Sequence, residues 1–192
     1  YSINLEHMAD NSAAPVNTGW TIQANATGVG FSTFGQNNRE QQFGIIQQHG
    51  QCNAPQLLLT IASQQDGFES FVGQTATLHI QMGQHSGIIE VPIIDVVQAS
   101  ANTQLAVLSN FVLNQHWLDD LGSNAQLEVE ILSPVSLYTS STNDTETFDL
   151  SGYRAMASLA KLRCQNTLNQ TANTPRNIHT IFSDTIFFSA WG

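Results

Sequence analysis

The sequence predicts an all-β protein, mainly an antiparallel sandwich or partly open barrel, with two short helices near 109–121 and 150–164. Short segments of alternating apolar and polar side chains recur along the chain, and turn residues separate them. Charged residues make up only 10% of the composition, against a usual share of about a quarter. Asn, Gln, Ser and Thr supply the polarity instead, a surface that suits strands and turns.

In the first third of the chain, alternation and apolar runs predict strands at 20–24, 41–48 and 56–63. The last of these is a nearly continuous apolar run, which is typical of a strand that is buried on both faces. Gly28, Gly30 and Gly35 predict a turn-rich passage between the first two strands.

The middle of the chain continues the same pattern. Residues 68–72 are expected to form a short edge strand, and further strands are expected at 76–82, 88–97, 105–108 and 126–132. Pro92 lacks an N–H group, so the strand that contains it should lie on an edge or be kinked there.

The two helices are predicted from apolar spacing. Leu113, Trp117 and Leu121 recur at four-residue steps, and Gly122 follows as a common residue just past a helix end. The second helix has an apolar stripe at Leu150, Tyr153, Ala160 and Cys164, with Asp149 or Ser151 as its cap and an extended segment before it.

We divide the chain into an N-terminal arm (1–18), a β-sandwich domain (19–165) and a C-terminal linker and tail (166–192). Residues 165–176 read as a linker by composition, and 178–191 are apolar and aromatic. The tail either covers a sheet edge on its own subunit or adds a strand to a neighbour. Its candidate partner-binding residues are Ile181, Phe182, Ile186, Phe187, Phe188 and Trp191.

Charge excludes some classes of partner. The formal net charge is −10 and the chain has one lysine, so no basic patch exists for a nucleic acid or an anionic lipid surface. No run of about twenty apolar residues occurs, and no membrane span is expected. The chain starts at Tyr1 without Met, which fits either a mature chain whose leader has been removed or a trimmed sequence. We favour the first and expect the chain in the periplasm or outside the cell.

The two cysteines are Cys52 and Cys164, and they form neither a CxxC pair nor a zinc cluster. They are either two buried thiols or one disulfide. We expect the disulfide, because the other features indicate export.

No catalytic signature is present, and we expect no catalytic residues, cofactor or metal. His79 and His85 flank a turn and could meet, with His49 or Glu90 as a third metal ligand, but the spacing does not require it. We therefore expect an exported, non-enzymatic binding or assembly protein, such as a subunit of an envelope or surface structure joined by strand exchange. The alternatives are a small secreted hydrolase and a glycan-binding module that uses Trp20, Trp117 or Trp191, each of which is more typical of a core.

Several motifs together resemble a known group of proteins. These are Trp20 in an opening strand, Cys52 before LLLTI, the LHIQMG strand, LEVEI after a short helix, and the closing FDLSGYRAMASLAKLRC. The chain from about 20 to 165 resembles bacterial periplasmic β-sandwich proteins of the invasion-associated locus B and type VI secretion TagO kind. The resemblance implies a periplasmic or secreted accessory protein without catalytic residues, whereas the segment after 165 departs from that pattern.

Overall fold

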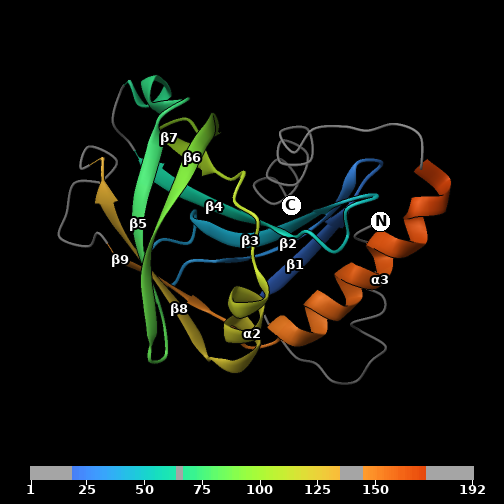
Figure 1. The fold of residues 1–192 in the computed structure, drawn as a ribbon. Coiled ribbons are helices and arrows are strands. Elements are labelled where there is room, and N and C mark those ends of the chain that lie inside the picture. Colours follow the sequence, from blue (N-terminus) through green and yellow to red (C-terminus); the bar gives the residue numbers. More distant parts are fainter. Residues whose placement is uncertain (1–18, 64–66, 135–144, 172–192) are drawn as a thin grey trace.

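The computed structural model describes residues 19–63, 67–134 and 145–171, and these form one open sheet of nine strands with three helices (Figure 1). The strands lie in the order β1-β2-β3-β4-β7-β6-β5-β8-β9, and every pair is antiparallel. The strands are β1 (Trp20–Ala24), β2 (Gly28–Phe34), β3 (Gln42–Gln48), β4 (Gln56–Ser63), β5 (Thr75–Met82), β6 (His85–Ser100), β7 (Thr103–Leu108), β8 (Gln126–Ser133) and β9 (Thr145–Asp149). The helices are η1 (Phe68–Phe71), α2 (Gln115–Ser123) and α3 (Tyr153–Thr171).

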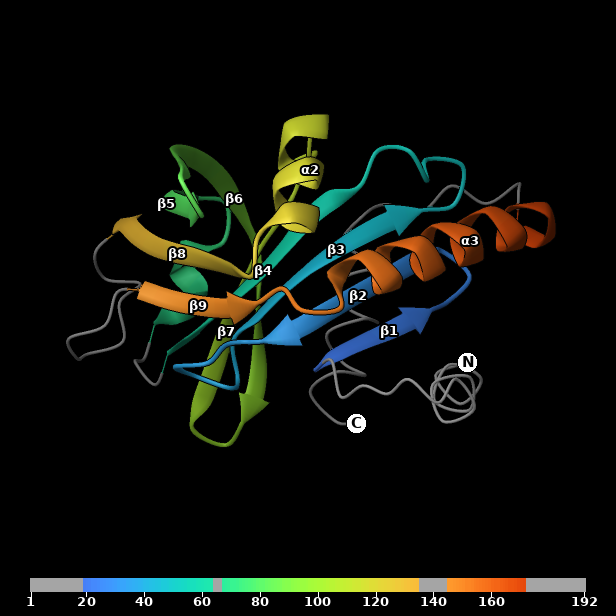
Figure 2. The same ribbon diagram turned by 90° about the horizontal axis from the view of Figure 1, so that it is seen from below.

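The long strand β6 bends the sheet into two halves. Its first part pairs with β5 as far as Pro92, and from Ile93 onward it pairs with β7, with register irregularities after Ile93 and Gln98. The strand therefore changes partner directly after Pro92, the residue that has no N–H to donate to a ladder. Figures 1 and 2 show β5, β8 and β9 running across the β1–β4 half.

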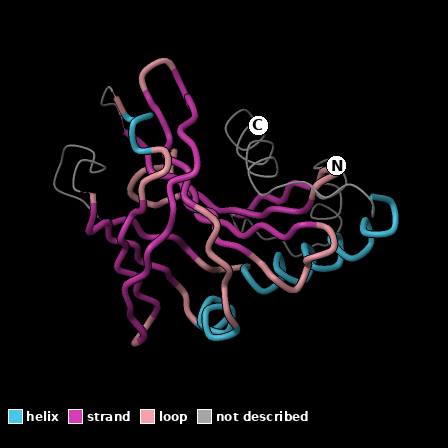
Figure 3. Tube along the Cα trace, turned by 45° about the horizontal axis from the view of Figure 1, so that its top comes forward, coloured by secondary structure: helices cyan, strands magenta, loops and turns pink. Residues whose placement is uncertain are grey.

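The main hydrophobic core lies between the two halves of the sheet. Phe31 and Phe43 enter it from one half, and Leu78, Val129 and Phe148 enter it from the other. All three helices contribute to this same core, through Phe68 of η1, Leu121 of α2, and Tyr153, Ala160 and Cys164 of α3. The predicted apolar stripe of α3 is thus confirmed, and the helix (drawn in cyan in Figure 3) lies along one side of β1–β4.

The predicted disulfide between Cys52 and Cys164 is present. It joins the turn after β3 to α3 across 112 positions of sequence, with the two Cα atoms 5.9 Å apart. Cys164 is fully buried, so the link lies inside the core. The all-β class with two main helices is likewise confirmed.

Four element predictions were wrong in detail. Residues 28–34 form strand β2, because Val29 and Phe31 point into the core while Gly28 and Gly30 face the other way. Residues 68–71 form a 3-10 helix that inserts Phe68. Helix α2 begins at Gln115, because Asn114 caps it there, and it continues to Ser123, so Gly122 lies inside the helix rather than past its end. Helix α3 continues to Thr171, so the first part of the expected linker is helical.

Candidate functional site

The described sheet has two edge strands, β1 and β9, and they differ in their backbone partners. The turn between β2 and β3 closes the outer side of β9. The Gln36 N–H donates to the Thr147 carbonyl at 2.9 Å, and the Asn37 side-chain amide donates to the Thr145 carbonyl at 2.8 Å. A strand edge whose carbonyls are already bonded offers no template for another strand.

The Glu146 carboxylate completes this closure. It accepts the backbone N–H groups of Asn37 and Asn38 at 2.8 Å each, the side-chain amide of Gln41 at 2.8 Å, and the N–H of Thr147 at 2.9 Å. The side chain is buried at 7% exposure, and these charge-assisted bonds compensate its desolvation. Glu146 therefore binds the β2–β3 turn rather than an external ligand.

Strand β1 has no such cover from the described residues. The Asn25 N–H donates to the Gly28 carbonyl, so the alternation of an antiparallel ladder directs the N–H and C=O groups of Gln23 toward β2 and those of Ile22 and Ala24 away from it. The strand contains no proline and no charged residue, which are the usual devices that protect an edge. Within the described ranges, no residue bonds to the outward N–H and C=O groups of Ile22 and Ala24.

An aromatic cluster fixes the position of this edge. Trp20 packs against Phe31, Phe43 and Tyr153, with ring centroids 5.5, 6.3 and 6.0 Å away, and its indole N–H donates to the Ser151 carbonyl at 2.9 Å. Burial raises the pKa of Tyr153 to about 12, because the phenolate would lose its hydration. Trp20 is thus a core residue here, as its 7% exposure indicates.

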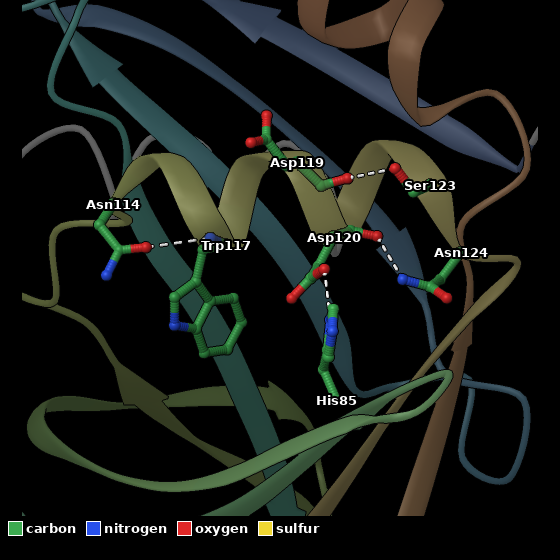
Figure 4. A network of polar contacts seen from close by, with 7 residues as sticks. All are labelled: His85, Asn114, Trp117, Asp119, Asp120, Ser123 and Asn124. Atoms are coloured by element: carbon green, nitrogen blue, oxygen red, sulfur yellow. Dashed lines mark hydrogen bonds and ion pairs between the residues drawn. The ribbon is translucent and has the colours of Figure 1, made fainter.

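A second polar group lies between the β5–β6 hairpin and α2 (Figure 4). His85 Nδ1 lies 2.8 Å from Asp120 Oδ1, Asn124 donates to the Asp120 carbonyl, and the Asn114 side chain accepts the N–H of Trp117 as the helix cap. A carboxylate on Nδ1 is how a general-base histidine is oriented. However, no hydroxyl or thiol of the described residues bonds to the other ring nitrogen of His85, so the pair acts here as a tether for α2.

The remaining histidine candidates do not converge. His79 lies 3.9 Å from Glu130 on β8, whereas His85 pairs with Asp120, so the two do not meet. His49 binds the Asn25 carbonyl at the other end of the sheet. Within the described ranges no three His, Cys, Asp or Glu side chains are grouped for a metal ion.

Of the residues singled out in the sequence, Cys52 and Cys164 form the disulfide. The partner-binding candidates Ile181, Phe182, Ile186, Phe187, Phe188 and Trp191 lie outside the described residues. Trp117 is partly buried against Phe111, with ring centroids 6.0 Å apart.

Sequence reasoning missed the unequal edges. The pairing of β9 with the β2–β3 turn depends on residues more than a hundred positions apart, and no local pattern reports it. The one available signal was the charge content: Glu146 and Asp149 occur in β9, and β1 has no charged residue.

No family model, curated protein or solved structure matches this chain. The resemblance to periplasmic accessory proteins therefore stays a prediction. None of the helices in the described ranges has the length and apolar character needed to cross a bilayer.

Proposed function

We propose that this chain is an exported, non-enzymatic protein of the periplasm or cell surface that works by binding or assembly. The observation that carries the proposal is the pair of unequal edges, one bound to its own turn and one with outward backbone groups at Ile22 and Ala24. An extended segment that adds to β1 would form backbone hydrogen bonds with this strand and would lie next to the aromatic cluster around Trp20.

Export is supported by the disulfide and by the composition. A buried link between distant parts of the chain is typical of proteins that fold in an oxidising compartment. Only five basic residues occur in 192, so association is expected to depend on strand pairing rather than on positive charge.

The test is a proline at the outward N–H of β1. Ala24→Pro removes a donor that points away from β2, so the strand keeps its own ladder and loses a bond to any added strand. The matched control is Ala24→Val, which keeps the N–H and favours a strand. We expect the parent chain and Ala24→Val to self-associate with rising concentration, measured by sedimentation, and Ala24→Pro to stay monomeric.

Circular dichroism and a thiol count establish that both variants keep the fold and the disulfide. A parent chain that is monomeric at every concentration would overturn assembly through this edge. If Ala24→Pro associates as strongly as the parent chain, the association takes place through a surface other than β1.

A further inference from the structure

The β1–β4 half of the sheet has a second, separate apolar cluster on the side away from α3. Ile46, Leu58 and Val107 are 0%, 0% and 1% exposed, and the partly buried Ile94 and Val97 pack against them. We call this cluster the back face. Strand alternation places Phe43, Ile45, Leu57 and Leu59 on the opposite side, in the main core.

The back face cannot bury itself within the sheet. The residue directly across from Ile46 on β2 is Gly30, and the residue across from Leu58 on β3 is Gly44. Glycine has no side chain to shield a neighbour that stands perpendicular to the sheet. Complete burial of Ile46 and Leu58 therefore requires a layer that lies over the sheet.

No described helix provides that layer. Phe68 of η1, Leu121 of α2 and Tyr153 of α3 all belong to the main core, and Figure 3 shows α3 on a single side of the strands. The four strands β2, β3, β4 and β7 contain no charged residue, which is the composition of strands covered on both faces.

We propose that the back face is the docking site of residues 178–191 of the same chain. Among the segments outside the described ranges, this one has the most large apolar side chains, namely Ile178, Ile181, Phe182, Ile186, Phe187, Phe188 and Trp191. The four strands span about 14 Å from β2 to β7, since neighbours lie about 4.8 Å apart. A fourteen-residue segment covers that width whether it is helical, at about 21 Å, or extended.

The connection is also long enough. Helix α3 ends at Thr171, and residues 172–177 precede the apolar segment. Six residues reach about 20 Å when extended, which equals two layer spacings of about 10 Å each, one from the α3 layer to the sheet and one from the sheet to a layer on its back face. Docking on its own chain leaves the β1 edge free for a partner.

The test is a double-mutant cycle between the tail and two adjacent leucines. Leu58 faces the back face and Leu59 faces the main core, and both are at most 2% exposed. Each is changed to Ala in the full chain and in a chain that ends at Thr171, and the urea midpoint of unfolding is measured. We expect Leu58→Ala to lower the midpoint of the full chain at least twice as much as that of the shortened chain. Leu59→Ala should lower both midpoints equally.

Where the shortened chain does not fold, the full-length double variant Phe187→Ser and Phe188→Ser takes its place in the same cycle. Equal shifts for Leu58→Ala with and without the intact tail would overturn the docking site. Sedimentation of the full chain shows whether the docked tail comes from the same chain or from a second copy. A monomer in which Leu58 and the tail are energetically coupled supports docking of the chain's own tail. A dimer that becomes monomeric on truncation assigns the tail to a second copy and overturns docking within one chain.

Discussion

At the residue scale, the buried tyrosine beside Trp20 links pH to stability. Burial raises the pKa of Tyr153 from 10.0 to about 12, because the folded core disfavours the phenolate. The stabilising contribution is therefore fully present below pH 10 and is lost as the pH rises through 12. A difference of this size corresponds to about 2–3 kcal/mol.

We expect Tyr153→Phe to have a shallower loss of stability between pH 10 and 12 than the parent chain. Urea unfolding at pH 8 and pH 11 measures this, and the ultraviolet titration of the phenolate identifies the group. At pH 8 the two proteins should be equally stable within about 1 kcal/mol, since Phe conserves the apolar contacts. Identical losses in both proteins at pH 11 would contradict the role of Tyr153.

Glu146 is the second residue whose burial has a measurable consequence. Glu146→Gln places an amide group among the N–H donors of Asn37, Asn38 and Thr147, so at least one buried donor loses its acceptor. The expected loss is about 2–3 kcal/mol in the free energy of unfolding, as for other hydrogen bonds to a charged group. The control is the exposed Glu40→Gln, which should change stability by less than about 0.5 kcal/mol. Equal effects of the two substitutions would refute the closure of β9.

At the scale of elements, the disulfide determines how firmly α3 is held. It links the turn after β3 to the helix whose Tyr153 and Ala160 complete the core. Because the closed loop spans 112 positions, the Cys52→Ala, Cys164→Ala double variant should lose about 4–5 kcal/mol in the chain-entropy model. Denaturant unfolding of the variant and of the parent with and without reductant measures the loss. A parent that is insensitive to reductant, with both thiols titratable, would show that the link has no such role.

The elements differ in how well their own sequences predict them. Strands such as β5 and β8 alternate cleanly and have one face in the core, so their period is visible. Strand β2 was missed because its glycines, Gly28 and Gly30, are turn signals in a sequence. In the fold they lie on the face of the sheet that carries the back-face residue Ile46. Residues 68–71 resemble a strand by composition, yet the tertiary placement of Phe68 makes them helical.

At the scale of the whole molecule, the class of fold could be predicted from local patterns, and the disulfide from the composition and other features that indicate export. The candidate binding edge could not be predicted from the sequence. It depends on which strands lie at the two edges of the sheet and on which segments pack beside them. The order β1-β2-β3-β4-β7-β6-β5-β8-β9 results because β6 pairs with β5 in its first part and with β7 in its second part. In the sequence, Pro92 marks only the position at which the strand changes partner.

The same arrangement accounts for the unequal edges. Because the sheet bends but stays open, β9 approaches the β2–β3 turn, and Glu146 binds that turn. β1 lies at the far end of the strand order, and its own five residues include no carboxylate. Binding at one edge only favours pairwise association over an unlimited stack of sheets.

The most direct test of this account is amide hydrogen exchange of the monomeric full chain, resolved at β1 and β9. The Ala24 N–H, which points away from β2, should exchange far faster than the Gln23 N–H beside it. The Thr147 N–H should be protected in the parent and labile in Glu146→Gln, because the carboxylate is its acceptor. An Ala24 amide as slow as that of Gln23 in the monomer would show that β1 is already paired, and it would contradict the account.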